Sequence, residues 1–275
     1  MSPHDDVRTP AGKSPDYLFD SATELGREQL ALLEQMLDEQ TVHCLAEACV
    51  RPGDRCLDLG AGGGSVTRWL ADRTQPGGSV TAVDLTTEHL VVRPGVTVYR
   101  HDIHDGLPDD GPYDLIHARL LLLHLPRRAE ILRTLADGLA PGGRLVLGEF
   151  GARPNLVLAA PADGDAELFR RVQYLGHEVV SRGRGVSWEW AHEVAAHMAD
   201  AGLCGIRARE SSWTTTGGTP GCLLHRNYAR QAAAMLYAEG LTQEEFDRYC
   251  ELMLDPCFSA WFYQFVCTSG EKPPA

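Results

Sequence analysis

Four glycines that follow a short apolar run have the spacing of a nucleotide-binding turn. Gly60, Gly62, Gly63 and Gly64 come directly after the sequence RCLDL, and Ser65 then opens a stretch with apolar residues at helical spacing. A strand, a glycine turn and a helix begin a nucleotide-binding βα unit, because the turn is tight and the ligand lies against bare backbone. The helix N-terminus leaves N–H groups pointing into the same crevice.

Two aspartates near this loop favour one cofactor over another. Asp84 ends the next strand-like run, SVTAVDL, where an acid can accept both ribose hydroxyls. Asp58 precedes the loop by two residues, where it would repel a pyrophosphate and attract an ammonium group. Ser65 also occupies the third glycine position of G-x-G-x-x-G. S-adenosylmethionine carries adenine, ribose, ammonium and carboxylate groups without phosphate, so we expect it in preference to NAD.

The composition limits the class of protein. The chain has 275 residues, 44% hydrophobic residues and a formal net charge of −13, with no dense basic run. We therefore expect a globular α/β enzyme and no nucleic-acid partner. The eight cysteines form no C-x-x-C pattern, no signal peptide is seen, and no apolar run approaches the roughly 20 residues that span a bilayer. These features predict a cytoplasmic protein with reduced thiols and no membrane partner.

Strand-like and helical segments alternate through the middle of the chain, which predicts an α/β fold with a parallel sheet. The expected divisions are a disordered tail over 1–14, two N-terminal helices within 15–50, a cofactor-binding core over 51–150, a helical cap insertion over 151–202, and strands and helices that complete the sheet over 203–275. Ligands of such sheets bind at the carboxyl ends of the strands. Side chains that could act there follow five strands: Asp58, Asp84, Asp102, His117 and Glu149.

The motifs DLGAGGG, AVDL, HDI, YDLIHARLLLLHL and LAPGGRLVLGEF, in this order, resemble the successive motifs of class I S-adenosylmethionine-dependent methyltransferases. The resemblance covers about residues 50 to 150. It implies a Rossmann-like, doubly wound sheet of seven strands whose last strand is antiparallel, with 203–214 and 261–268 as the sixth and seventh. The stretch FDSATELGREQLALLE and the long region after the core are similar to small-molecule methyltransferases of actinobacterial specialised metabolism.

The same resemblance implies a cofactor site made from four stretches of the chain. Gly60, Ala61, Gly62 and the Asp58 side of the loop would hold the methionine part, and Asp84 would bind the ribose. Leu85 would pack on the adenine, Asp102 and Ile103 would flank its amino edge, and Ala118 and Arg119 would line the methyl-donor side. Asp102 has a second interpretation, as the cap of a turn.

Methyl transfer is an in-line displacement, so alignment of the reacting atoms is the main task of the enzyme. A neutral hydroxyl acceptor also needs a base, and His124, Glu149 and His117 are the candidates, each with a structural role as the alternative. Tyr17, His177 and His225 are candidates for substrate contact. We expect no metal, because His192 and His197 are spaced by five and so leave the shared helical face.

The expected activity is transfer of a methyl group to an O, N or C atom of a small molecule in natural-product (antibiotic) biosynthesis. Two alternatives remain open at this stage. One is a cyclase or isomerase of the same fold that binds S-adenosylmethionine, and the other is an NAD-dependent oxidoreductase. A homodimer is compatible with these observations.

Overall fold

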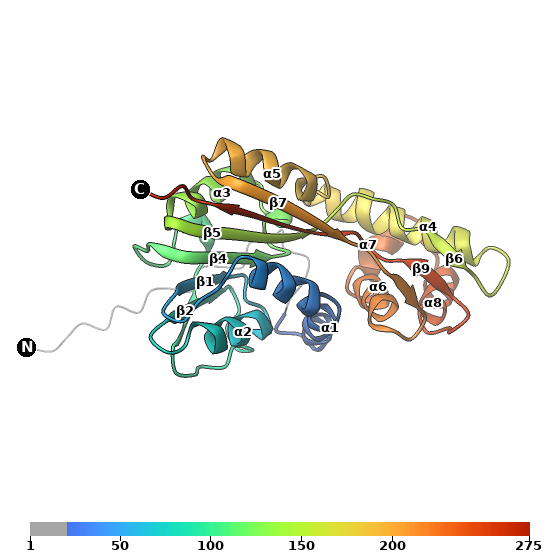
Figure 1. Cartoon of the computed structure of the whole chain (residues 1–275). Coiled ribbons are helices and arrows are strands. Elements are labelled where there is room, and N and C mark those ends of the chain that lie inside the picture. The colour runs from blue at the N-terminus through green and yellow to red at the C-terminus, as the bar shows by residue number, and fades with distance from the viewer. Residues whose placement is uncertain (1–20) are drawn as a thin grey trace, which may run out of the picture.

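The computed structural model describes residues 21–275. The predicted tail and Tyr17 lie outside the described residues. Figure 1 shows two lobes: a larger one built on a central sheet, and a smaller one, to the right, made of helices and short strands. The long strands of the larger lobe point toward the junction between the two.

The central sheet has seven strands in the order β3-β2-β1-β4-β5-β10-β7. In chain order they are β1 (Arg55–Leu59), β2 (Ser79–Asp84), β3 (Val96–Arg100), β4 (Tyr113–Arg119), β5 (Leu139–Phe150), β7 (Cys204–Ser211) and β10 (Phe265–Glu271). The first five are parallel, and β10 runs antiparallel to both β5 and β7. The predicted seven-stranded sheet with an antiparallel last strand is therefore confirmed.

Helices cover both faces of this sheet. On one face lie α1 (Glu24–Glu47) and α2 (Ser65–Thr74), and on the other lie α3 (Arg128–Asp137) and α5 (Trp190–Asp200). Leu37, Leu57, Leu70 and Leu132 have no exposed surface, because the apolar stripes of the helices face strands that are buried on both sides. The glycine loop lies between β1 and α2, as the sequence predicts.

The N-terminal segment is one helix and not the two that the gap in its apolar pattern predicts. Helix α1 runs unbroken for 24 residues, and Thr23 caps it by accepting a hydrogen bond from the Gly26 N–H at 3.0 Å. Of the polar residues in the gap, Asp38 accepts hydrogen bonds from Ser65 and Arg119, and Thr41 donates to the Leu37 carbonyl, so both are accommodated within the helix. At its start, α1 bonds to α6 (Pro220–Gln231), where Asn227 donates to the Leu25 carbonyl at 3.0 Å and to Glu28 at 2.9 Å.

The segment after β4 also differs from the predicted helix. It forms a short 3-10 turn, η2 (Leu122–His124), and α3 begins only at Arg128, after Pro126. Leu120 has a positive φ of 51°, which turns the chain sharply at the end of β4. His124 therefore lies in a turn at the carboxyl end of the sheet and not in a helix. A second 3-10 turn, η1 (Ile103–Asp105), follows β3.

The smaller lobe combines residues from two separate parts of the chain. Its antiparallel sheet has the order β6-β9-β8, and its strands are β6 (Val157–Ala159), β8 (Thr214–Thr216) and β9 (Ser259–Trp261). Its helices are α4 (Asp165–Tyr174), the π-helix η3 (Leu175–Ser181), α6, α7 (Ala233–Ala238) and α8 (Gln243–Leu252). The lobe has a hydrophobic core of its own around Phe169, Leu236, Tyr249 and Phe258.

This arrangement corrects the expected division at residue 202. Helix α5 packs against the central sheet and so belongs to the larger lobe, whereas α6, α7 and α8 belong to the smaller one. The aromatic run from Trp261 is also split: its start pairs in the small sheet as β9, and the seventh strand begins only at Phe265. Residues Phe262, Tyr263 and Gln264 cross between the two sheets and are buried.

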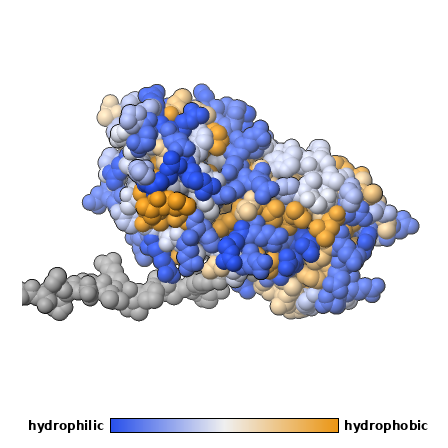
Figure 2. All heavy atoms as spheres, turned by 90° about the horizontal axis from the view of Figure 1, so that it is seen from below, coloured by the Kyte–Doolittle hydropathy of each residue, from blue (hydrophilic) through white to orange (hydrophobic). Residues whose placement is uncertain are grey.

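Figure 2 shows the surface from below, where apolar side chains gather at one spot on the larger lobe and along part of the smaller one. Some large apolar residues are well exposed, among them Leu85 in the larger lobe and Trp261 in the smaller lobe. Within residues 21–275, no helix combines the length and the apolar character needed to cross a bilayer.

Candidate active site

The glycine loop is held against the end of β2 by its own backbone. The N–H groups of Gly60 and Ala61 both donate to the Val83 carbonyl, at 2.8 and 3.0 Å. Gly60, Gly62 and Gly64 have φ values of 69°, 54° and 79°, which residues other than glycine rarely adopt. The loop is therefore a tight turn at the carboxyl end of β1, with the side chains of Leu30 and Leu121 close to its backbone.

Asp84 lies at the end of β2, beside the loop. Its Oδ2 accepts the Gly62 N–H and its Oδ1 accepts the Thr86 N–H, both at 2.9 Å. Desolvation by burial raises the pKa of this carboxyl, against the effect of the backbone hydrogen bonds. The next residue, Leu85, is 48% exposed and offers an apolar surface. A carboxylate fixed beside an exposed leucine suits a ribose with an adenine attached.

Asp102 and Ile103 follow β3 at the same edge. Asp102 Oδ1 accepts the backbone N–H of His104 at 2.9 Å and lies 2.8 Å from His104 Nδ1, so the turn-capping interpretation of this residue is correct. Desolvation alone would raise the pKa of Asp102, but the bonds from His104 outweigh it and lower the pKa. Ile103 is buried beneath the turn.

The structure assigns Asp58 and His117 to a different place from the one expected. Asp58 is 1% exposed; its Oδ2 accepts the Thr67 hydroxyl at 2.5 Å and its Oδ1 lies 2.8 Å from His117 Nδ1. Both oxygens are therefore engaged by the protein, and His117 is itself 2% exposed. The pair connects β1, β4 and α2 beneath the loop. The ammonium contact of Asp58 and the role of His117 as a base remain predictions, and this geometry favours a structural role for the pair.

A carboxylate that the sequence analysis did not single out lies over the loop instead. Helix α1 places Glu34 so that its Oε1 accepts the Ser65 N–H at 3.3 Å, at the first turn of α2. A Cβ at Gly63 would lie 2.4 Å from the same oxygen, so glycine is needed for this approach. Because the N-terminus of α2 already holds a carboxylate, a phosphate there would be repelled, whereas an ammonium group would be attracted.

Helix α1 also carries Asp38, which connects the loop to the end of β4. Asp38 Oδ1 accepts the Ser65 hydroxyl at 2.9 Å and the Arg119 guanidinium at 2.8 Å. Arg119 donates in addition to Thr41 at 3.1 Å and is largely buried, while Ala118 has no exposed surface. Both residues predicted on the methyl-donor side thus lie at the carboxyl end of β4, next to the loop. The acids of α1 gave no signal in the sequence, because acidic residues are ordinary on the polar face of a surface helix.

Glu149, near the end of β5, is 1% exposed. Its Oε1 accepts the N–H groups of Leu122 and Leu123, at 2.9 and 3.3 Å, and so fixes the turn that carries His124. Its Oε2 is buried without a hydrogen-bond partner in the described part of the chain. Burial raises the pKa of Glu149 to about 8, although the two N–H groups and Arg128 oppose the shift. Burial lowers the pKa of His124 to about 4, so its imidazole is neutral at pH 7.

His177 and His225 meet in a group of rings between the lobes, which we call the aromatic cluster: Phe150, Phe169, His177, Trp188, His225, Phe262 and Tyr263. The Tyr263 ring lies 4.8 Å from His177 and 5.1 Å from His225, centroid to centroid. Phe150, the residue after Glu149, lies 4.9 Å from Tyr263. Both predicted substrate histidines are therefore at the carboxyl end of β5. Where Tyr17 lies relative to them is outside the described residues.

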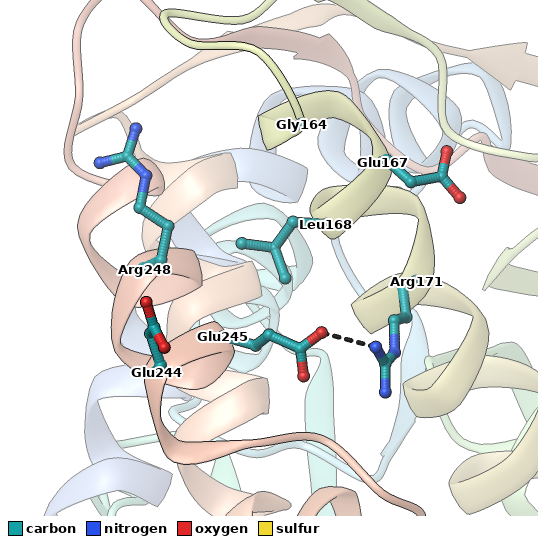
Figure 3. A pocket seen from close by; sticks show the side chains of 7 residues that line it. All are labelled: Gly164, Glu167, Leu168, Arg171, Glu244, Glu245 and Arg248. Atoms are coloured by element: carbon teal, nitrogen blue, oxygen red, sulfur yellow. Dashed lines mark hydrogen bonds and ion pairs between the residues drawn. The ribbon is translucent and has the colours of Figure 1, made fainter.

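A hollow of about 380 Å³ lies elsewhere, between α4 and α8 of the smaller lobe. Figure 3 shows Leu168 between charged side chains and the ion pair between Arg171 and Glu245, whose atoms are 2.5 Å apart. The hollow is formed by elements of the smaller lobe alone and contains none of the predicted site residues. Residues 21–275 contain no group of three or more His, Cys, Asp or Glu side chains that could hold a metal.

Comparison with known proteins agrees with this geometry. A family described as "Methyltransferase domain" matches residues 29–207. A relative from Amycolatopsis mediterranei, named 27-O-demethylrifamycin SV methyltransferase, is 32% identical over 212 residues, which cover 70% of this chain and 72% of the relative. A ubiquinone biosynthesis O-methyltransferase from Marinobacter nauticus is 33% identical over 119 residues, 39% of this chain and 49% of that protein.

A solved structure shows the same fold. It is a phosphoethanolamine N-methyltransferase from Haemonchus contortus in complex with phosphomonomethylethanolamine and S-adenosylhomocysteine. It matches 92% of this chain and 58% of its own with a TM-score of 0.55 and 18% identity.

Proposed function

From the premise that this chain belongs to the class I S-adenosylmethionine-dependent methyltransferases, we propose that it methylates an oxygen atom of a small molecule in natural-product biosynthesis. Membership makes it an enzyme with S-adenosylmethionine as its cofactor and a small-molecule substrate. The choice of oxygen is supported by the names of the rifamycin and ubiquinone relatives. Their names also support a role in a biosynthetic pathway.

The observation that carries this proposal is the arrangement around Gly62, where Asp84 binds the loop backbone and Glu34 faces the start of α2. We assign the ribose to Asp84 and the adenine to Leu85, with Ile103 and Asp102 at its edge. We assign the ammonium group of the methionine part to Glu34, in the place first given to Asp58. Backbone groups of Gly60, Ala61 and Gly62, with Ala118 and Arg119 opposite, complete the methionine side.

When bound, S-adenosylmethionine supplies a methyl group on a positively charged sulfur, which becomes a neutral thioether once the acceptor oxygen holds the methyl. The protein's own part is to take the proton of the acceptor hydroxyl. Glu149 suits this task, because its Oε2 has no hydrogen-bond partner among residues 21–275 and a pKa of about 8 lies close to neutral pH. His124, on the turn that Glu149 fixes, is the second candidate.

The test is to incubate the full chain with S-adenosylmethionine labelled in its methyl group and a panel of hydroxylated, aminated and activated-carbon acceptors. Release of one S-adenosylhomocysteine for each labelled methyl ether is the expected result. Labelled product on nitrogen or carbon would overturn the choice of oxygen. Conversion of an acceptor without release of S-adenosylhomocysteine would replace methyl transfer by cyclase or isomerase chemistry, and NADH binding would favour an oxidoreductase.

We further propose a cytoplasmic protein that does not act on nucleic acid. This rests on a net charge of −13 and on eight cysteines that are all free thiols. Size-exclusion chromatography with light scattering decides between a monomer and the homodimer that the sequence leaves open.

A further inference from the structure

We propose that the aromatic cluster binds the acceptor, and that the acceptor is an uncharged aromatic compound whose ring carries a hydroxyl group. This inference rests on the proposed function and adds the class of substrate to it. It is carried by the position of the cluster, by the two unpaired nitrogens of His225 and by the uncharged surroundings of that side chain.

The cluster adjoins the turn that Glu149 fixes. The Ser187 N–H donates to the carbonyl of Leu123, whose own N–H is accepted by Glu149, and the ring of the next residue, Trp188, lies 4.6 Å from His177. Phe150 ends β5, and its ring contacts Tyr263 at 4.9 Å and Phe262 at 5.6 Å. His225 reaches the same rings from α6, at 4.8 Å from Phe262 and 5.1 Å from Tyr263. The cluster therefore joins the carboxyl end of β5 to the smaller lobe, on the side of the sheet where ligands of this fold bind.

His225 has unused hydrogen-bonding capacity in a buried place. The side chain is 2% exposed, and neither Nδ1 nor Nε2 has a hydrogen-bond partner among residues 21–275. Native proteins leave few buried polar groups unpaired, because such a group has lost its hydrogen bonds to water and has gained none in return. A neutral imidazole offers one donor and one acceptor. A hydroxyl group, which can both donate and accept, provides the missing partner.

The surroundings of His225 select against a charged ligand. The rings that contact it belong to Phe169, Phe262 and Tyr263, none of which carries a charge. Burial lowers the pKa of His225 to about 3 and that of His177 to about 4, so both imidazoles are neutral at pH 7. The same desolvation opposes a carboxylate or an ammonium group on the ligand. Ring faces and edges favour a planar aromatic partner.

Two other polar side chains of the cluster, His177 and Tyr263, are held by hydrogen bonds within the protein. His177 Nε2 is hydrogen-bonded to the Tyr263 hydroxyl, which donates to Gln173 Oε1 at 3.4 Å, and Gln173 donates in turn to Tyr249 at 2.7 Å. His177 lies in the π-helix η3, a rare form that is frequent at functional sites. This network holds Tyr263 and His177 in place. Among residues 21–275 it leaves the two ring nitrogens of His225 and the indole N–H of Trp188 as the buried polar groups of the cluster without a partner, and of these only His225 can both donate to a hydroxyl and accept from it.

The experiment compares two ligands on the wild-type chain saturated with S-adenosylhomocysteine. We expect 2-naphthol to bind at least about tenfold more tightly than naphthalene by calorimetry or tryptophan quenching, as the gain of one or two hydrogen bonds predicts. We expect 2-naphthoate, with the same ring and a charge, to bind more weakly than 2-naphthol. Equal binding of 2-naphthol and naphthalene, or tighter binding of the carboxylate, overturns the inference, and this comparison needs no variant.

A variant tests whether His225 causes the preference for 2-naphthol over naphthalene. His225→Phe keeps a ring of similar shape, so we expect it to remove the preference for 2-naphthol over naphthalene while leaving the affinity for S-adenosylhomocysteine within about twofold. His197→Phe, in α5 beside Trp190, is the matched control and keeps the preference. A preference that survives His225→Phe overturns the assignment. If the wild-type chain does not bind S-adenosylhomocysteine at all, the proposed function itself has failed, which is a separate result.

Discussion

His117 and Asp58 face each other across neighbouring strands β4 and β1, with Nδ1 of one 2.8 Å from Oδ1 of the other. Both side chains are almost completely buried. Thr67 of α2 binds the second oxygen of Asp58, so three elements that surround the glycine loop are joined by one carboxylate. The pair therefore joins three elements around the loop, and we expect it to support the loop from beneath rather than to act in the chemistry.

Replacement of His117 should affect stability more than catalysis. His117→Phe leaves a buried oxygen of Asp58 without its partner, so we expect the free energy of unfolding to fall by about 1–3 kcal/mol in urea titrations. Turnover of the folded enzyme at saturating cofactor should stay within about threefold of wild type. A loss of turnover by a factor of about 100 or more, with unchanged stability, would return His117 to the catalytic candidates.

Asp84→Ala should weaken the cofactor site by removing the acceptor of the ribose hydroxyls. We expect S-adenosylhomocysteine to bind about 10- to 100-fold more weakly in calorimetry, as the loss of hydrogen bonds to a charged group predicts. Asp200→Ala, at the exposed end of α5, is the control and should bind as the wild type does. Unchanged affinity in Asp84→Ala would show that the ribose lies elsewhere.

Glu34→Gln tests which carboxylate receives the ammonium group. We expect about tenfold weaker binding of S-adenosylhomocysteine, because a charge-assisted hydrogen bond becomes a neutral one. Binding of 5′-methylthioadenosine, which lacks the amino-acid part, should not change. An equal effect on both ligands would mean that Glu34 acts only through the position of the loop.

The pH dependence of turnover tests Glu149. The carboxyl accepts a proton only when ionised, so with a pKa of about 8 the active fraction rises as the pH rises through that value. We expect initial rates to increase with a midpoint near 8, and Glu149→Gln to lower turnover by about 100-fold or more and to remove the pH dependence. If turnover survives in Glu149→Gln and is lost in His124→Asn, His124 is the base.

His225 should make the folded protein less stable in mild acid. In the unfolded chain its imidazole takes up a proton below its ordinary pKa of 6.5, whereas in the folded protein the pKa is about 3. Protons thus favour the unfolded state as the pH falls from 6.5 toward 3, and stability is lost there. His225→Phe lacks this loss, so its advantage over wild type should grow by roughly 1 kcal/mol for each pH unit in that range. If the free energies of unfolding of the two proteins differ by a constant amount across this range, the folded imidazole takes up a proton as readily as the unfolded one, and the lowered pKa is wrong.

The central sheet could be predicted because its information is local. β1, β2 and β4 are short, mostly buried runs that end near a polar residue, and residues such as Leu57 and Val83 indicate burial without any distant contact. The small sheet gave no such signal. Its three strands have three residues each, and Val157 pairs with Ala260, more than a hundred positions away in the chain.

The orientation of the site residues was harder to predict than their position. In β1 the residues from Cys56 to Leu59 are all buried, so no alternation shows which face Asp58 points to. Asp58 points to the face of the sheet that α2 covers, where it bonds to Thr67. Glu34 of α1 lies over the loop, in the place that the sequence suggested for Asp58. Contacts of this kind depend on how a distant helix docks, which the spacing of residues does not encode.

Helix α1 contacts both the glycine loop, where we place the cofactor, and α6, which carries His225. Its middle holds Glu34 and Asp38 against the glycine loop, and its first turns bond to Asn227, two residues beyond His225 in α6. A displacement of this helix by one ligand would reach the other site. Any coupling of the two ligands through α1 must then be reciprocal, so that each changes the affinity for the other by the same factor.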